Sequence, residues 1–316
     1  VIKMRDIIIK VNNNCILRCP YCFAYEEAQN ELLEDDMKRM LRFCRDNQLE
    51  SVKITGGEPF LYKYIVEFIN HITEFADVMI FSNLMVNNCL FNLKRKDKVK
   101  NLANINEPDF YTDNQYKTLM SNISYAVETG VTIVPGRTFY HKPFDLSDII
   151  ALCEKYGLKT IRISQANPTI LKNNMWLTAA DINCFLHYIQ GVNEELEHKN
   201  ICINFDCPIA PCVVDNDLYS YFCSRNVLTS KCGTKLVVNP DLTVEHCYIT
   251  APIAVGKSIF QYNSYDDALN DISNQLSAYR TKMALDKCHD CEHKCDLTPC
   301  GCYGFMDLLA GGRTSE

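Results

Sequence analysis

The sequence lacks the features that would direct a protein to nucleic acid, to a membrane or into a secretory pathway. Its 316 residues carry 32 Lys and Arg against 39 Asp and Glu, a formal net charge of −7, so it has no basic footprint for nucleic acid. No stretch reaches the roughly 20 apolar residues of a membrane span. The chain opens with Val-Ile-Lys-Met-Arg-Asp and shows no signal-peptide pattern. We therefore expect a cytoplasmic protein with no nucleic-acid or membrane partner.

Cysteine, by contrast, is abundant, with 18 residues in the chain. A secreted scaffold held by disulfides would explain this number, but a chain of this length can bury a large core without them. The cysteines also cluster within 15–22 and 288–302, and clustered thiols in a reducing compartment indicate metal binding. The scattered ones are expected to be small buried hydrophobic residues: Cys44, Cys89, Cys153 and Cys184.

The run Cys15-Ile-Leu-Arg-Cys19-Pro-Tyr-Cys22 places three thiols at CxxxCxxC spacing after an expected strand. Structural zinc sites and ordinary iron–sulfur sites use four protein ligands. A site with three can leave one coordination position open for a group that is not protein. A catalytic metal site needs such an open position, whereas a purely structural site has none.

Strand-like runs alternate with helix-like runs over the first two thirds of the chain. Strands are expected at Asp6–Val11, Val52–Thr55, Val78–Phe81, Leu102–Ile105, Val131–Val134 and Ile161–Ile163. Helices are expected near 31–48, 62–76, 112–129 and 145–156. This alternation predicts an α/β fold with a parallel sheet and right-handed crossovers. Six such units do not reach the eight of a closed barrel, so we expect a partial (β/α)6 TIM-like barrel with an open lateral mouth.

The carboxyl ends of parallel strands gather on one rim, where such folds carry their chemistry. The Cys15–Cys22 loop leaves the first expected strand there, Gly56-Gly57-Glu58-Pro59 leaves the second, and Ser82-Asn83 leaves the third. A helix near 178–198 and a strand at Ile201–Phe205 complete a first domain, residues 1–205. Three candidate site elements are therefore expected side by side.

The later chain changes character and is expected to form a second, cysteine-rich domain. Residues 206–231 contain Pro208 and Pro211 and no clean periodicity, which favours a linker. Residues 232–316 form the second domain, with a hairpin over 232–247 and a helix near 265–285. Its cysteines are the candidate metal ligands: Cys232, Cys247, Cys288, Cys291, Cys295, Cys300 and Cys302.

The CxxxCxxC run, with Tyr21 before its last cysteine and a GGEP segment about one βα unit later, resembles the radical S-adenosylmethionine (SAM) superfamily. The resemblance implies a [4Fe–4S] cluster on Cys15, Cys19 and Cys22, whose fourth iron takes the amino and carboxylate groups of SAM. An electron from the cluster would cleave the sulfonium and give a 5′-deoxyadenosyl radical that abstracts hydrogen from substrate. A reductant such as flavodoxin or ferredoxin would supply that electron.

The resemblance also implies roles around SAM. Gly56 and Gly57 would let the backbone approach the cofactor, and Glu58 would accept a hydrogen bond from its ammonium group. Ser82-Asn83 would contact the ribose or carboxylate, or would simply cap a loop. Arg162 would pair with the SAM carboxylate, or would form an ordinary surface ion pair.

The C-terminal cysteines look like the SPASM or twitch extensions of that superfamily, which hold auxiliary [4Fe–4S] clusters. The pattern departs from SPASM, since Leu242 stands where a glycine is expected, x3 follows Cys291 instead of x5, and no cysteine follows Cys302. The thiols suffice for one or two auxiliary clusters, with Cys212 or Cys223 as further candidates. A zinc ribbon is the alternative.

Enzymes of this architecture mostly modify ribosomally made peptides or proteins, and others act on small molecules. The first strand begins within ten residues of the start, so a peptide substrate would be recognised by a separate protein or by the extension itself. Asn104 and Asn106 are expected to line the pocket. Tyr140, His141 and Asp206 are candidate proton acceptors, and none is assigned as catalytic. A non-catalytic metal protein remains a third hypothesis.

Overall fold

The computed structural model describes residues 5–23, 30–229, 232–282, 285–288, 290–291 and 300–311. Seven parallel strands come first: β1 (Asp6–Lys10), β2 (Ser51–Thr55), β3 (Asp77–Ser82), β4 (Val99–Asn104), β5 (Thr132–Phe139), β6 (Thr160–Gln165) and β7 (Cys202–Phe205). The long helices between them are α1 (Glu34–Asp46), α2 (Ile65–Ile72), α3 (Asp113–Thr129), α4 (Ser147–Tyr156) and α5 (Ala179–His198). The expected strands and helices are thus confirmed to within a few residues.

The later part of the chain adds α6 (Asn216–Ser224), β8 (Val237–Val238), β9 (Thr243–Glu245), β10 (Val255–Ser258), α7 (Tyr265–Lys282) and α8 (Tyr303–Leu309). Short 3-10 helices lie at Pro59–Leu61, Lys96–Lys98, Pro108–Phe110, Pro211–Val213, Ile259–Gln261 and Asp286–Cys288. No helix in the described ranges combines the length and the apolar character that a membrane span requires.

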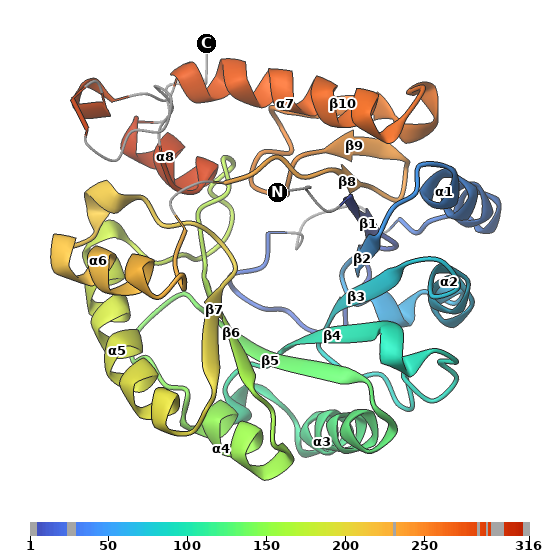
Figure 1. Ribbon diagram of the computed structural model, residues 1–316, viewed down its shortest axis with the longest axis horizontal. Coiled ribbons are helices and arrows are strands. Elements are labelled where there is room, and N and C mark those ends of the chain that lie inside the picture. Colours follow the sequence, from blue (N-terminus) through green and yellow to red (C-terminus); the bar gives the residue numbers. More distant parts are fainter. Residues whose placement is uncertain are drawn as a thin grey trace.

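The strands form one ten-stranded sheet in the order β10-β9-β8-β1-β2-β3-β4-β5-β6-β7. The sheet curves into an open barrel, with α1 to α5 along its outer side and α7 beside the β8–β10 end (Figure 1). The expected partial barrel is therefore confirmed. All strands from β1 to β7 are parallel, so their carboxyl ends meet at one rim.

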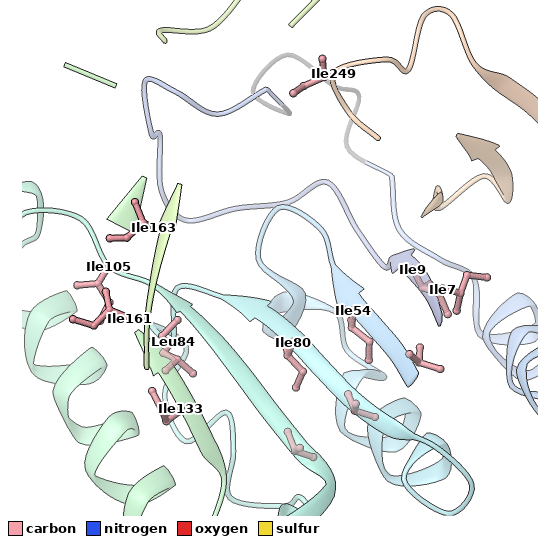
Figure 2. Packing of buried hydrophobic residues seen from close by; sticks show 14 of the residues in the cluster. Ile7, Ile9, Ile54, Ile80, Leu84, Ile105, Ile133, Ile161, Ile163 and Ile249 are labelled. Carbon is pink, nitrogen blue, oxygen red and sulfur yellow. The ribbon is translucent and has the colours of Figure 1, made fainter. Parts of the chain in front are cut away.

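Alternate β-branched residues build the layer of the core on the helix side of the sheet. Ile9 pairs in register with Ile54, and Ile54 pairs with Ile80, so that three isoleucines lie on neighbouring strands (Figure 2). All three are 0% exposed. Because side chains alternate across a strand, this row leaves the intervening positions for the other face of the sheet.

Helix boundaries follow local chemistry. Thr112 accepts a hydrogen bond from Gln115 N and the Gln115 side chain accepts one from Thr112 N, a capping box at the start of α3. Gly130 and Gly157 end α3 and α4 with φ of +83° and +65°, the left-handed conformation that glycine adopts at least cost. Both ends agree with the sequence prediction.

The C-terminal hairpin is joined to the barrel by hydrogen bonds. β8 pairs with β1 in parallel, while β9 pairs antiparallel with β8 and β10. The segment 206–231, expected to be a linker, contains the nine-residue helix α6, which contacts α5. The nearby prolines hide its periodicity from sequence analysis. The division into domains stays a prediction, because no break in the sheet marks the boundary.

Three of the four scattered cysteines, Cys44, Cys89 and Cys153, are buried as expected. The prediction for Cys184 is wrong, because this residue is exposed. The core-facing stripe of α5 runs through positions such as Ile182 and Phe185, and position 184 lies off that stripe.

Candidate active site

The three N-terminal thiols lie in the loop that leaves the carboxyl end of β1, and all three are half-buried. Leu17 N lies 3.4 Å from Cys15 Sγ and Asn106 Nδ2 lies 3.4 Å from Cys19 Sγ, each as a donor. Burial, the largest cause, raises the pKa of Cys15 to about 11. A buried thiol ionises when a metal binds it, and N–H donors stabilise the resulting sulfur charge. The donor set therefore fits an iron–sulfur cluster.

The glycines of the GGEP segment pack against the backbone that leads into this loop. A Cβ on Gly57 would lie 2.2 Å from the carbonyl oxygen of Asn14, and one on Gly56 would lie 2.7 Å from that of Asn12. Gly57 N donates to Asn12 O at 3.0 Å and Glu58 N donates to Asn14 O at 2.6 Å. The contacts that require glycine are thus within the protein. The predicted approach to a cofactor stays a prediction.

Glu58 is 0% exposed and its carboxylate has three donors inside the protein. Ser82 Oγ donates at 2.8 Å, Asn83 N at 2.8 Å and Phe60 N at 3.0 Å. Burial raises the pKa of Glu58 to about 7, against the lowering effect of these hydrogen bonds. In this arrangement Glu58 ties the loop after β2 to the end of β3. Its predicted contact with an ammonium group stays a prediction.

Asn83 links the end of β3 to the cysteine loop. Its Nδ2 lies 3.9 Å from Cys15 Sγ, while its Oδ1 accepts a hydrogen bond from Met85 N at 2.9 Å. Ser82 Oγ also accepts one from Leu84 N at 2.9 Å. Both residues therefore cap the loop, and their predicted contact with the ribose or carboxylate of SAM stays a prediction. The rim brings together the three elements that the sequence predicted to meet there.

Tyr21 is the centre of a polar network in the barrel. Its hydroxyl donates to Asn106 Oδ1 at 2.5 Å and accepts from Asn104 Nδ2 at 2.7 Å. Burial raises the pKa of Tyr21 well above its usual value, and the nearby Cys19 adds to this effect. Its ring also packs on that of Tyr140, with centroids 5.2 Å apart. The network holds the cysteine loop against the end of β4.

Arg162 extends this network to the other side of the barrel. Its Nη2 donates to Asn104 Oδ1 at 3.2 Å and its Nη1 to Asp206 Oδ2 at 2.8 Å. The same carboxylate oxygen accepts a hydrogen bond from Ser164 Oγ. Arg162 is 9% exposed, so its ion pair is largely buried and not a surface pair. Its predicted contact with a SAM carboxylate stays a prediction.

Gly136, which sequence analysis missed, makes the position of Arg162 possible. A Cβ there would lie 2.6 Å from the Arg162 carbonyl oxygen and 2.8 Å from Arg162 Nε. Gly136 lies beyond the expected strand Val131–Val134 but inside β5, so only a longer expected strand would have made this glycine a signal of close approach.

A second group of thiols lies near the end of β7. Burial, the largest cause, raises the pKa of Cys302 well above its usual value. The nearby thiols of Cys207, Cys247 and Cys232 raise it further. Burial also raises the pKa of Cys207 to about 12 and that of Cys247 to about 11. Cys207 was placed in the linker by sequence analysis, and only the fold brings it to the other three. We call Cys207, Cys232, Cys247 and Cys302 the C-terminal thiol group.

The surroundings of this group contain a lysine, Lys235, and one histidine, His246. Lys235 is close enough to lower the pKa of Cys207 and Cys232, against the larger effect of burial. His246 Nδ1 faces Lys235 N at 3.1 Å, and His246 Nε2 lies 3.6 Å from Cys232 Sγ. Since a backbone N–H must donate to Nδ1, the proton of the neutral ring is assigned to Nε2 and points to that sulfur. Leu242, where SPASM sequences are expected to have glycine, has a φ of +72°.

The other predicted C-terminal ligands lie further along the chain. Cys288 and Cys291 are half-buried, Cys300 is buried, and Cys295 lies outside the described residues. Within the described ranges, no three His, Cys, Asp or Glu side chains are close enough to hold one metal ion. An iron–sulfur cluster places each thiolate on a different iron, so its ligands are farther apart than those of a single ion.

Comparisons with known proteins agree with this geometry. Residues 9–114 match the Radical SAM superfamily. A probable GTP 3′,8-cyclase of Methanopyrus kandleri is 34% identical over 83 residues, which cover 26% of this chain and 27% of that protein. The PqqA peptide cyclase of Rhodopseudomonas palustris is 32% identical over 92 residues, covering 28% and 24%. The matched stretches thus span about a quarter of these curated relatives.

Solved structures show the fold over a longer part of the chain. Streptococcus suis SuiB bound to its precursor peptide SuiA superimposes with a TM-score of 0.67 at 16% identity, covering 92% of this chain and 72% of that one. At this identity the likeness shows the architecture alone. It covers both the barrel and the cysteine-rich end of the chain.

Proposed function

Because the chain belongs to the radical SAM superfamily, we propose that it cleaves SAM reductively and modifies a side chain of a ribosomally made peptide or protein. The observation that carries the proposal is the half-buried three-thiol loop at the end of β1, with N–H donors on its sulfurs. Cys15, Cys19 and Cys22 would hold a [4Fe–4S] cluster, which would supply the electron for reductive cleavage of SAM.

The residues around the loop hold it in place. Tyr21 and Asn106 fix its inner side, since Asn106 contacts both the Tyr21 hydroxyl and Cys19 Sγ. Glu58 accepts hydrogen bonds from Ser82 and Asn83, and Asn83 in turn approaches Cys15. Asn14 Oδ1 is buried and has no hydrogen-bond partner among the described residues, so it is available to accept from an N–H of the SAM amino group. We retain all the predicted cofactor contacts as proposals: Tyr21, Gly56, Gly57, Glu58, Ser82, Asn83 and Arg162.

We further propose that the C-terminal thiol group holds an auxiliary [4Fe–4S] cluster. Four thiols of this kind are a complete iron–sulfur ligand set. Cys288, Cys291, Cys295 and Cys300 remain proposed ligands of the same or of a second cluster. Such a cluster supplies an acceptor for the electron that a net oxidation of the substrate releases. His246 Nε2–H, directed at Cys232 Sγ, would tune its potential.

A small-molecule substrate is the second candidate, favoured by the match to a GTP 3′,8-cyclase. The matches to this protein and to the PqqA peptide cyclase are of similar identity and each cover about a quarter of this chain. They therefore support the superfamily equally and do not decide between the two substrates. The likeness to a peptide-bound enzyme is one of architecture, and because it spans 92% of this chain we put the peptide first.

The radical chemistry is tested by measuring 5′-deoxyadenosine after anaerobic reduction with SAM. Cys19→Ala is expected to abolish the product, because the cluster loses one of three anchors. Cys184→Ser changes an exposed thiol on α5 and is the matched control, expected to retain full activity. Product formation by Cys19→Ala at the wild-type rate would contradict the proposal.

The auxiliary site is tested by the same measurement together with iron and sulfide analysis. Cys247→Ala is expected to lower the iron and sulfide content by up to one cluster. It should leave formation of 5′-deoxyadenosine measurable but stop turnover of the peptide substrate. We expect the same two results for Cys291→Ala. Unchanged iron content in Cys247→Ala would argue against a cluster on the C-terminal thiol group.

A further inference from the structure

A hollow of about 270 Å³ opens between the cysteine loop and two later segments of the chain. Phe23, directly after Cys22, forms one wall; the β6–α5 connection provides Thr169 and Leu171, and the loop after Cys247 provides Tyr248, Ile249 and Ala251. None of the described residues that line it is Lys, Arg, His, Asp or Glu. The described lining is therefore uncharged, and the nearby cation of Lys10 lies 5.0 Å from the centroid of the Tyr248 ring.

The wall from the β6–α5 connection is fixed to the cysteine loop by hydrogen bonds. Met175 N donates to Pro20 O at 3.0 Å, and Asn174 Nδ2 donates to Tyr21 O at 3.2 Å. No sequence pattern singles out Asn174, whose side chain is largely buried. This wall is thus built against the candidate active site.

The wall from the loop after Cys247 is fixed on two sides. The ring of Tyr248 stacks on that of Phe23, with centroids 4.2 Å apart. From behind, α8 packs so closely that a Cβ on Gly304 would lie 1.9 Å from the Pro168 carbonyl oxygen and 2.6 Å from Ile249 Cγ2. Figure 2 places Ile249 apart from the isoleucines of the strands. Gly304 therefore holds both later walls together.

The position of the hollow relates it to both groups of thiols. Phe23 follows Cys22 of the cysteine loop, and Tyr248 follows Cys247 of the C-terminal thiol group. The outer edge is apolar and open, with Leu171 68% and Phe23 36% exposed. A side chain that enters between these walls places its neighbours in a peptide chain within reach of the cysteine loop.

Size and charge limit what can bind. The volume of about 270 Å³ is at the lower limit of the roughly 300–1,000 Å³ of pockets that bury a drug-sized ligand. A nucleoside triphosphate needs cationic donors, and the described lining has none. Most of the described lining side chains are apolar, and Thr169 and Asn173 are its polar members. The volume and these apolar side chains suit one aliphatic or aromatic side chain.

We propose that this hollow is a specificity pocket that binds one uncharged apolar side chain of the peptide substrate. The inference rests on the proposed peptide-modifying function and names its substrate class.

Binding of short peptides tests the proposal without any turnover. The probes are N-trifluoroacetyl Gly-Gly-Xaa-Gly-Gly amides with Xaa Leu, Phe, Asp or Gly, and 19F NMR reports their dissociation constants. We expect the Leu or Phe peptide to bind wild-type protein about tenfold or more tightly than the Gly and Asp peptides. Ala251→Phe, which fills the hollow, and Leu171→Asp, which charges its edge, should reduce this preference to about twofold or less.

Leu33→Asp is the matched control, because Leu33 is 66% exposed and lies outside the hollow. It should keep the wild-type preference. An equal affinity for all four peptides, a preference that survives Ala251→Phe, or displacement of the Leu peptide by GTP would overturn the pocket. Release of 5′-deoxyadenosine is measured separately. If the protein releases it but shows no preference among the peptides, the pocket is refuted and the radical SAM activity is not.

Discussion

At the scale of single residues, Gly57 is the position where one methyl group would do most damage. Its Cβ would overlap the Asn14 carbonyl oxygen, a backbone atom that cannot rotate away. We expect Gly57→Ala to lower the free energy of unfolding by about 1–3 kcal/mol, measured by urea denaturation. Gly191→Ala in α5 meets nothing within 4 Å and should raise it by up to about 1 kcal/mol. Equal stability of Gly57→Ala and wild type would contradict the packing argument.

Glu58 predicts a dependence of stability on pH. Its pKa is raised by burial to about 7, from an ordinary 4.5. Between these two values the unfolded chain loses its proton before the folded chain does. The contribution is therefore fully present below 4.5, decreases as pH rises towards 7, and is lost above it, by about 3 kcal/mol in total. Urea midpoints measured from pH 4.5 to 8 should show this decrease.

Glu58→Gln should flatten that pH profile, because its amide does not titrate. The exposed Glu194, on α5, provides the control, and Glu194→Gln should keep the wild-type slope. If Glu58→Gln retains the whole pH dependence, burial of this carboxyl is not its cause.

At the scale of elements, Arg137 joins the end of β4 and the start of α4 to β5. It is 1% exposed, and its guanidinium donates to Asp145 O at 2.6 Å, Asp148 Oδ2 at 2.7 Å and Asn106 O at 3.0 Å. Arg137→Met would leave these acceptors unpaired, and we expect a loss of about 3–5 kcal/mol in unfolding free energy. The exposed pair of Arg95 with Asp97 is the comparison, and Arg95→Met should change stability by about 0.5 kcal/mol or less.

The regular elements of the barrel were predictable because hydrophobic periodicity and glycine caps act locally. Three features could not be predicted from the sequence. Helix α6 follows prolines that mask its pattern, Cys207 joins other thiols only through the fold, and Gly56 and Gly57 proved to accommodate neighbouring backbone. The partner of Arg162 was equally hidden, since Asp206 lies 44 positions away in the chain. Sequence patterns identify residues that chemistry needs, whereas tertiary packing decides which atoms they meet.

At the scale of the whole molecule, the C-terminal hairpin is part of the barrel sheet. Ile8 N donates to Leu236 O at 2.9 Å, and Ile9 pairs with Val238, which is 0% exposed. We expect Val238→Asp to increase hydrogen exchange of the β1 amides about tenfold or more, because a buried charge opens this pairing. Val255→Asp on the edge strand β10, where Val255 is 47% exposed, should leave β1 protected. Mass spectrometry of peptides covering β1 provides the measurement.

The parallel pairing of β1 with β8 fixes the distance between the cysteine loop and the segment that carries Cys247. The loop that carries Cys15 and the segment that carries Cys247 start from strands in one sheet, so neither can slide along the other during a reaction cycle. The peptide substrate itself must then span the distance between the pocket and the cysteine loop. We expect the number of residues between an anchored side chain and the reacting one to be invariant among accepted peptides, whatever the rest of their sequence.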